Sequence, residues 1–264
     1  MFDLPGLKRE TRYGMPAADQ IIINRHYTIG YSYYFRQAKW ALEIVGKDVE
    51  QKDLIILDDG KASSDLKIID AGFKKKERLD NFRPDYRIPE RFRTDLAEYR
   101  GSGYDRGHLV ASANQDEEDV QNSETFLLSN MSPQKPKFNR GIWKELEGAI
   151  RVLNEPDEIM ETYVICGPIF NFDVPIKTIN PKGEKGNTLP IPHGYFKSVL
   201  TEDIKGKLKM WSFLMPNEAS NKPLKDFLVS TRRVERYSGL LLWERLVGRA
   251  IDREKENVRD MWKV

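Results

Sequence analysis

The sequence contains little cysteine and no long hydrophobic run. Cys166 is the only cysteine in 264 residues, so an internal disulfide is excluded and a reducing compartment is expected. No stretch approaches the ~18 consecutive apolar residues of a membrane-spanning helix, so no membrane partner is expected. The first residues, MFDLPGLKRETRYGMP, lack the apolar stretch of a secretory or transit signal. We therefore expect the cytoplasm or another reducing compartment, or the mitochondrion if a presequence has been removed.

An excess of one charge is also missing. Lys and Arg number 43 and Asp and Glu number 41, which gives a formal net charge of +2. Histone-like and basic-tail proteins are thereby excluded, and a polyanion has to be bound by a local basic patch. Low-complexity segments and internal repeats are absent as well, which excludes disordered and solenoid proteins. With 39% hydrophobic residues, the chain can bury one sizeable core.

The chain is expected to form one domain with two flanking segments. We interpret residues 1–20 as an N-terminal arm, residues 21–243 as the domain and residues 244–264 as a charged helical tail. Within the domain, residues 48–73 hold two short strand candidates and an Asp-Asp-Gly turn signal, which indicates an insertion on the sheet. Residues 74–108 are charged and interrupted by Pro84 and Pro89, so they predict a connection outside the core.

Runs rich in β-branched and aromatic residues predict a mostly antiparallel sheet. YTIGYS (27–32) and KWALEIV (39–45) have the spacing of a hairpin. Three further runs predict strands: ETYVICGPIF (161–170), YFKSVLT (195–201) and KMWSFLMP (209–216). Because these runs are combined with helical segments, the fold class is α+β, a central sheet flanked by helices.

The middle of the chain predicts the order strand, loop, strand, helix. The first strand lies in YDRGHLVASAN (104–114) and the second in TFLLSN (125–130). The helix follows from an apolar stripe at spacings of three, four and seven residues: Ile142, Leu146, Ala149, Ile150 and Leu153. Asn139 stands just before this stripe, where a helix N-cap is expected.

Of the three histidines, only His108 has neighbours that point to catalysis. His26, at the edge of a strand, is best interpreted as structural, and His193, in a proline-rich loop, as a packing residue. His108 follows Arg106, which can donate two hydrogen bonds to a phosphate, and Gly107, which permits a ligand to approach the backbone closely. A neutral imidazole at this place could take a proton from an attacking water.

Phosphodiester hydrolysis also needs a cation, and the predicted helix carries suitable oxygen ligands. Asn139 and Glu147 lie eight residues apart, which in an α-helix is a rise of ~12 Å and a rotation to within ~80° of the same face. We assign Asn139 as the direct ligand and Glu147 as a ligand acting through a metal-bound water. Such hydrated coordination suits Mg²⁺, with Mn²⁺ as a substitute. Taken singly, Asn139 is more simply a helix cap and Glu147 an exposed charge.

Together, three segments resemble a known signature. DRGH (105–108), SNMSPQ (129–134) and FNRGIWKELE (138–147) are similar to the active-site motif of the DNA/RNA non-specific endonucleases, the ββα-metal or His-Me finger nucleases. Weaker similarities extend across residues 24–243. The resemblance implies a ββα-metal fold, and the strand, loop, strand, helix order agrees with it independently.

The resemblance also implies a role for each matching residue. His108 would be the general base, Asn139 the single protein ligand of the catalytic Mg²⁺, and Glu147 the residue that holds the metal's water shell. Asn130 would hold the geometry of the site and the phosphate, and Arg106 is the motif arginine. The candidate for the transition-state arginine is Arg78, and its neighbours Arg83 and Arg87 remain rivals.

These features predict an Mg²⁺-dependent endonuclease that cuts DNA and RNA with little sequence preference and leaves 5′-phosphate products. Phosphate contacts position a nucleic acid without reading its bases, which accounts for the weak preference. The resemblance further implies a homodimer. Two alternatives stay open: a catalytically silent nucleic-acid-binding or protein-interaction module of the same fold, and a nuclease effector controlled by an inhibitor or activator protein.

Overall fold

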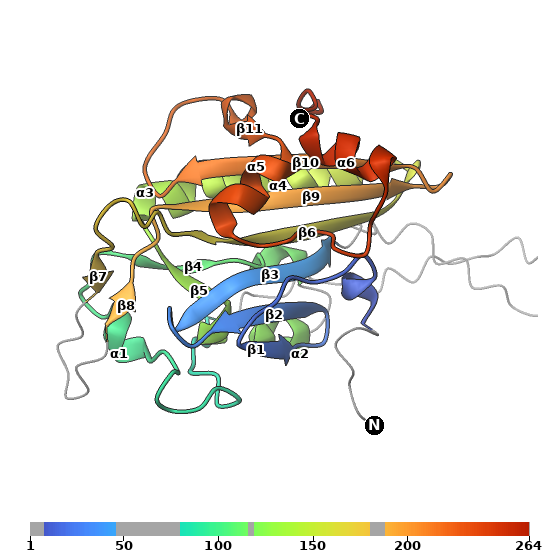
Figure 1. The fold of residues 1–264 in the computed structure, drawn as a ribbon. Helices are drawn as coiled ribbons and strands as arrows, with labels where there is room; N and C mark the ends of the chain where they lie inside the picture. Colours follow the sequence, from blue (N-terminus) through green and yellow to red (C-terminus); the bar gives the residue numbers. More distant parts are fainter. Residues whose placement is uncertain (1–7, 46–79, 116–118, 180–187, 264) are drawn as a thin grey trace, which may run out of the picture.

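The computed structural model describes residues 8–45, 80–115, 119–179 and 188–263. A seven-stranded antiparallel sheet in the order β1-β2-β3-β6-β9-β10-β11 forms its centre (Figure 1). Its strands are β1 (Gln20–Ile23), β2 (Tyr27–Ser32), β3 (Gln37–Val45), β6 (Ile159–Ile169), β9 (Gly194–Asp203), β10 (Leu208–Pro216) and β11 (Leu228–Val229). Two small pairs accompany it: β4 (Asp105–His108) with β5 (Met131–Gln134), and β7 (Thr178–Ile179) with β8 (Leu189–Pro190). All the strands predicted for the central sheet within the described residues are confirmed, including the β2-β3 hairpin.

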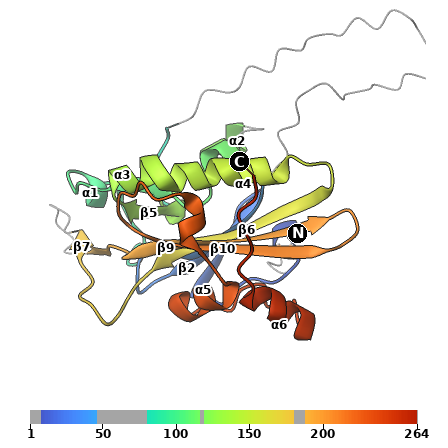
Figure 2. The same ribbon diagram turned by 90° about the horizontal axis from the view of Figure 1, so that it is seen from above.

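Helices cover both faces of the central sheet. The helices are α1 (Leu96–Tyr99), α2 (Asp119–Glu124), α3 (Pro136–Phe138), α4 (Lys144–Asn154), α5 (Thr231–Ser238) and α6 (Arg249–Glu256). Seen from above, α4 lies along one face and α5 and α6 lie on the opposite face (Figure 2). This confirms the α+β class. Among the described residues, no helix is long and apolar enough to cross a membrane.

Alternation along the strands divides the core into two layers. In β9, Tyr195 and Val199 pack in the layer beneath α4, whereas Phe196 and Leu200 pack in the layer beneath α5. The whole predicted helical stripe is buried in the α4 layer: Ile142, Leu146, Ala149, Ile150 and Leu153. The side of β9 that faces α4 therefore forms the floor on which the ββα segment rests.

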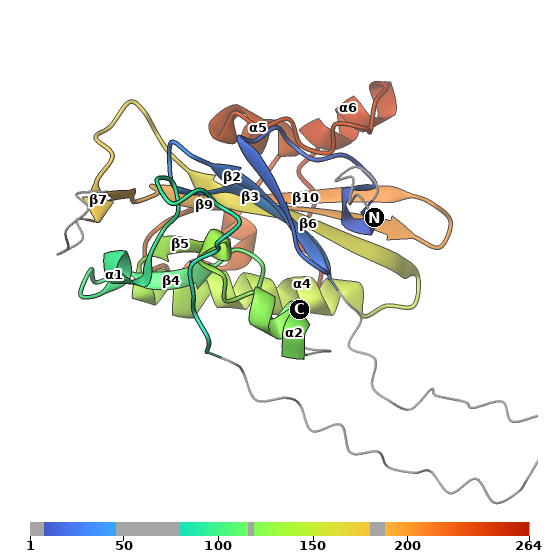
Figure 3. The same ribbon diagram turned by 90° about the horizontal axis from the view of Figure 1, so that it is seen from below.

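The predicted strand, loop, strand, helix order is confirmed, but two boundaries differ. The first strand ends at His108, so the apolar residues after it are buried without continuing the strand. TFLLSN forms turns and a short 3₁₀ turn, and the second strand is MSPQ, which begins at Met131. TFLLSN looks like a strand because Phe126 and Leu128 are buried, yet its backbone pairs only briefly, through hydrogen bonds from the Arg83 amide to the Phe126 carbonyl and from the Leu128 amide to the Arg83 carbonyl. Figure 3 shows β4 and β5 beside α4.

The N-terminal arm prediction is wrong for the residues that the structure describes. Residues 8–20 pack against the sheet, and Glu10 is buried and accepts a 2.8 Å hydrogen bond from Thr28 Oγ1. The buried Tyr13 donates a hydrogen bond to Glu202 on β9, 2.5 Å long. Hydrogen bonds with Thr28 and Glu202 of the sheet therefore attach this segment. The predicted insertion at residues 48–73 and the turn-rich loop at 180–187 lie outside the described residues.

The predicted helical tail is helical only in part. After α6 the chain is extended, crosses β10 and ends against α4 on the other face of the sheet (Figure 2). Trp211 Nε1 donates to the Asp260 carbonyl at 3.0 Å, and Trp262 Nε1 donates to the Ala149 carbonyl at 2.7 Å. The segment after α6 thus runs across β10 to α4, and these two hydrogen bonds attach it to both elements.

Trp262→Ala should destabilise the protein measurably. The substitution removes an edge-to-face contact with Trp211, at 5.5 Å between ring centroids, and the hydrogen bond to α4. Because Trp262 is only partly buried, we expect a loss of about 2 kcal/mol in the free energy of unfolding, below the usual loss for a buried tryptophan. Urea unfolding measures this loss, with the exposed Val258→Ala as a control; equal midpoints for the two variants would mean that the tail does not pack on α4.

Candidate active site

His108 lies at the end of β4, opposite Met131 of β5. Its partly exposed ring meets Phe126 edge to face, with 5.0 Å between the centroids, and lies 5.8 Å from the ring of Phe82. Its backbone carbonyl accepts a 3.2 Å hydrogen bond from Trp143 Nε1, on the segment that leads into α4. Aromatic packing on one side and the indole on the other therefore restrict where the imidazole can lie.

Arg106 and Gly107 have different surroundings. Arg106 is exposed, and its guanidinium carbon lies 4.1 Å from the centroid of the Phe82 ring, so stacking holds this charge beside His108. Gly107 is buried, and a Cβ there would meet the Gln134 side chain at 2.1 Å. The prediction that Gly107 admits a ligand is therefore wrong. The glycine is needed because the buried Gln134 of the paired strand fills this space.

Asp105, the first residue of β4, binds two residues of the helical segment that follows β5. Its Oδ2 accepts a 2.9 Å hydrogen bond from Asn139 Nδ2, and Arg140 donates to both of its oxygens at 2.7 and 2.8 Å. Burial raises the pKa of the Asp105 carboxyl, but the hydrogen bonds from Arg140 and Asn139 outweigh it and bring the pKa below its usual value. With its nitrogen bound to Asp105, Asn139 has its amide oxygen available as a ligand.

The N-cap prediction for Asn139 is wrong, because the helix begins earlier. Pro136 starts α3, and Asn139 has helical dihedral angles, φ −57° and ψ −49°. A π-helical turn, Asn139–Trp143, follows and is kinked at Gly141. Because this kink lies between them, Asn139 and Glu147 do not follow the rotation of ~80° that a continuous α-helix would give.

Glu147 lies in the first turn of α4 and is mostly buried, with 14% of its side chain exposed. Its Oε1 is 3.9 Å from Nζ of Lys197, a buried lysine of β9. That Glu147 faces the same cleft as Asn139 stays a prediction. The exposed-charge alternative for Glu147 does not agree with this inward position.

Asn130 is completely buried. Its Oδ1 accepts from the Val110 amide at 3.0 Å, and its Nδ2 donates to the carbonyls of Val110 and Thr125 at 3.0 and 2.9 Å. These hydrogen bonds join the start of the connection between β4 and β5, at Val110, to its end, at Asn130. The side chain thus links the segment after β4 to the turn before β5, and its burial gives no support to the expected phosphate contact.

The transition-state arginine was predicted to be Arg78, which lies outside the described residues. Both rivals are occupied by structural contacts. Arg83 donates to the Ser123 carbonyl at 2.9 Å, and Arg87 pairs with the buried Asp85 at 2.7 Å. A further arginine, Arg151, lies one turn after Glu147 on α4 and donates to Asn114 Oδ1 at 3.0 Å.

The other two histidines lie away from this constellation, whereas the Cys166 thiol donates to the Leu109 carbonyl, next to His108, at 3.1 Å. His26 is exposed in the turn before β2, and His193 lies in a loop where its Nδ1 accepts from the Asn171 amide at 3.1 Å. Cys166 is buried in β6, and burial raises the pKa of its thiol to about 12. The positions of His193 and Cys166 agree with the loop and buried-strand roles predicted for them, whereas the structural role predicted for His26 stays a prediction.

The residues present suit a hard, hydrated cation. An amide oxygen on Asn139 and a carboxylate on Glu147 are ligand types that Mg²⁺ accepts. Among the described residues, no group of three or more His, Cys, Asp or Glu side chains could enclose a metal. This fits a cation that keeps most of its waters and excludes a zinc-type cage within that part of the chain.

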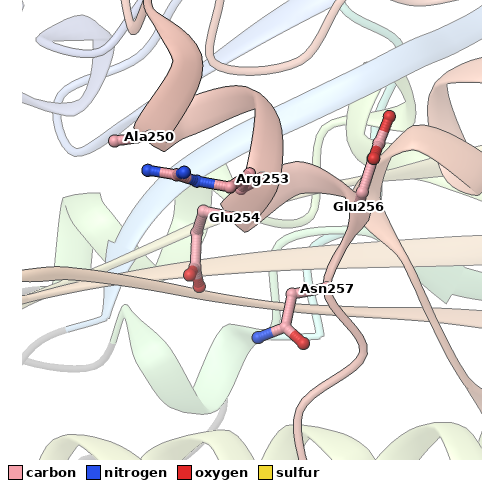
Figure 4. A pocket seen from close by; sticks show the side chains of 5 residues that line it. All are labelled: Ala250, Arg253, Glu254, Glu256 and Asn257. Atoms are coloured by element: carbon pink, nitrogen blue, oxygen red, sulfur yellow. The ribbon is translucent and has the colours of Figure 1, made fainter.

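A shallow hollow elsewhere on the surface is unrelated to this constellation. Figure 4 shows its lining on and after α6: Ala250, Arg253, Glu254, Glu256 and Asn257. Glu254 there accepts from the Met210 amide at 2.8 Å and pairs with Arg259, so its carboxylate is used to attach α6 to β10. The hollow lies on the opposite side of the sheet from α4 and is structural.

Comparison with known proteins agrees with this geometry. Residues 10–247 match the sequence profile of the DNA/RNA non-specific endonucleases. The chain belongs to this family. The DNA/RNA non-specific endonucleases are metal-dependent, and the chain is accordingly a hydrolytic nuclease that binds nucleic acid. Its ββα-metal fold, predicted from the sequence, is confirmed.

Individual members of the family match most of the chain. Human mitochondrial endonuclease G is 30% identical over 247 residues, which are 90% of this chain and 74% of that protein. A nuclease of Syncephalastrum racemosum is 36% identical over 178 residues, 63% of this chain and 55% of its own length. In the crystal structure of the EndoG/EndoGI complex, one chain is 28% identical, with a TM-score of 0.74 over 94% of this chain and 95% of that chain.

Sequence reasoning missed two residues of this endonuclease site. Asp105 is the first residue of the DRGH motif, but no role was predicted for it. A carboxylate at this place could have indicated a hydrogen-bond partner for the helix that carries Asn139. Lys197 carried a clearer signal, since it is a single charge inside the apolar strand run GYFKSVL. A lysine in such a position has to find a buried partner.

Proposed function

We propose that the chain is an Mg²⁺-dependent endonuclease that hydrolyses phosphodiester bonds of DNA and RNA with little sequence preference and leaves 5′-phosphate ends. The observation that carries the proposal is the joining of β4 to the helix: Asp105 at one end of the strand binds Asn139, and Trp143 binds the backbone of His108 at the other. A base and an oxygen ligand are thereby held in one rigid unit. Membership of the nuclease family supports the same conclusion.

In this proposal His108 is the general base. Its imidazole takes a proton from a water molecule, which then attacks the phosphorus in line with the departing 3′ oxygen. Packing against Phe126 and Phe82 orients the ring, so it need not be ordered when substrate binds. Arg106, exposed beside it on Phe82, donates hydrogen bonds to a non-bridging phosphate oxygen.

Asn139 and Glu147 would hold the cation, Asn139 through its amide oxygen and Glu147 through a water. A bound Mg²⁺ would neutralise the charge that develops on the phosphate and on the leaving oxygen. Asp105 keeps the Asn139 amide in one orientation, and Arg140 keeps Asp105 ionised. Asn130 fixes the loop between the two strands, so that His108 does not move relative to the helix.

Nucleic acid is expected to bind through its phosphates. Residues 131–151 carry five Lys or Arg and two Glu, and three of these cations are exposed on the helical segment: Lys137, Arg140 and Lys144. Binding should therefore weaken as salt rises, although the whole chain is nearly neutral. Because backbone contacts read no bases, DNA and RNA are both accepted.

A proteinaceous inhibitor is the partner that the comparisons favour. The similar solved chain comes from a complex of EndoG with EndoGI. A nuclease kept beside nucleic acid needs such control, and an inhibitor would cover the exposed helix and Arg106. A homodimer and a reducing or mitochondrial compartment remain predictions.

Plasmid cleavage tests the proposed function. With Mg²⁺, the purified chain should nick and then linearise supercoiled DNA and should degrade RNA of unrelated sequence, and EDTA should stop both reactions. End-labelling with and without phosphatase treatment identifies the 5′ phosphate. Nucleic-acid binding without cleavage at any Mg²⁺ or Mn²⁺ concentration would instead support the silent binding module.

A further inference from the structure

Lys197 is a buried cation in the floor beneath the candidate active site. It lies on β9 between Tyr195 and Val199, the two residues that face α4, and only 1% of it is exposed. Transfer of an ammonium group from water into a protein interior is costly unless opposite charges and hydrogen bonds compensate for it. Its contacts therefore indicate why the chain keeps a lysine at this position.

The contacts of Lys197 reach both halves of the ββα segment. Nζ donates to the carbonyl of Leu109, the residue after His108, at 3.3 Å. The same atom lies 3.9 Å from Glu147 Oε1 and 4.4 Å from the centroid of the Trp143 ring. One ammonium group thus contacts three segments: the residue that follows β4 and His108, the π turn at Trp143, and α4 at Glu147.

A second carboxylate completes the buried group. Glu43 on β3 is 1% exposed and accepts hydrogen bonds from Asn114 Nδ2 and Gln115 Nε2, both at 3.1 Å. Burial raises the pKa of Glu43 to about 7, although the charge of Lys197 and these hydrogen bonds oppose the rise. The charge of Lys197 therefore acts on two buried carboxylates, Glu43 and Glu147.

We propose that Lys197 is a positioning residue that fixes the Glu147 carboxylate relative to His108 and so places the water shell of the cation. The inference rests on the proposed function, in which Glu147 binds that shell. The Lys197 ammonium group restrains the carboxylate through its 3.9 Å contact with Oε1. Without the ammonium group, Glu147 would have more rotamers open to it, and the water shell would lose a fixed acceptor.

Direct metal binding tests this role in the folded chain without substrate. Mn²⁺ titration followed by electron paramagnetic resonance gives the dissociation constant for wild type, Lys197→Met and Lys197→Arg. We expect Lys197→Met to bind Mn²⁺ about tenfold more weakly, as is typical when a residue that supports a metal ligand is removed, and Lys197→Arg to regain part of the loss. The Mg²⁺ concentration for half-maximal cleavage should rise by a similar factor.

A matched control separates positioning from packing. Ser198 is the next residue of β9, is buried on the opposite face and accepts a 3.1 Å hydrogen bond from Trp243 Nε1. Ser198→Ala should lower stability and leave Mn²⁺ affinity unchanged. If Lys197→Met does not fold because Glu43 is left unpaired, the double variant Glu43→Gln/Lys197→Met removes both charges and is measured in its place.

A double-mutant cycle identifies the residue through which Lys197 acts. On a Glu147→Gln background, Lys197→Met should change the Mn²⁺ dissociation constant less than twofold, because the carboxylate that it positions is already gone. Equal Mn²⁺ affinity in wild type and Lys197→Met, or a full tenfold effect on the Glu147→Gln background, would overturn the inference. Failure of the proposed function would appear differently, as no cleavage by the wild-type chain at any Mg²⁺ concentration.

Discussion

His108→Ala should reduce the rate of plasmid cleavage by about 10³-fold or more, within the range that positioned general bases contribute. The substitution removes the imidazole that takes the proton from water. It leaves the bond between Trp143 Nε1 and the backbone carbonyl in place, because that bond uses no side-chain atom of residue 108. Binding of nucleic acid should persist, since the phosphate contacts come from other residues.

Single-turnover cleavage measured at saturating enzyme separates this loss of rate from weaker binding. His26→Ala is the matched control, because it removes an exposed imidazole from a turn outside the candidate site and should leave the rate unchanged. Circular dichroism and the urea midpoint establish equal folding of the two variants. Cleavage by His108→Ala within tenfold of wild type would remove His108 from the role of base.

The parts of the fold that could be predicted from the sequence are those with a local pattern. The β2-β3 hairpin, β6, β9 and β10 alternate or run apolar because they lie inside a two-sided sheet, and each one was predicted. The stripe from Ile142 to Leu153 was predicted because helical periodicity fixes which side chains reach the core. His108, Asn139 and Glu147 were predicted from their spacing and from the family resemblance, because the three motifs of the signature are short and lie within residues 105–147.

The parts that could not be predicted depend on contacts between distant residues. The π turn after Asn139 has no separate sequence signal, and the Lys135 amide just before α3 is bound by Asn217 Oδ1, 82 residues later, at 2.9 Å. Gly107 was interpreted as leaving room for a ligand because the Gln134 side chain, 27 residues later, is not evident in the local pattern. Such cross-strand and capping contacts exist only once the fold has formed.

The two ends of the chain show the same limit. Residues 8–20 and 257–263 are polar enough to suggest solvent-exposed segments, and both are attached by a few specific contacts. Tyr13 bonds to Glu202, and Trp262 bonds to the Ala149 carbonyl of α4. One aromatic residue in a charged segment is a weak signal in sequence, yet in the folded chain it decides where the segment lies.

Asn139→Ala should abolish metal-dependent cleavage, with a loss of about 10³-fold, because removal of a single preorganised electrostatic contact in a transition state has effects of about 10²–10³-fold and this residue also places the cation. Stability should change little, since Asp105 keeps two hydrogen bonds from Arg140 after Asn139 is shortened. Raising Mg²⁺ or Mn²⁺ should not restore the rate if the amide oxygen is the only direct protein ligand.

Two further variants locate the effect at the amide oxygen. Asp105→Asn keeps the shape of the partner but loses its charge, so Asn139 and Arg140 are held less firmly and the rate should fall by about 10–100-fold, less than for Asn139→Ala. Asn257→Ala, at the exposed end of α6 on the other side of the sheet, should cleave like wild type. Mn²⁺ binding by Asn139→Ala as tight as in wild type would assign the cation to other ligands, because an amide that bears the only direct protein bond cannot be dispensable for affinity.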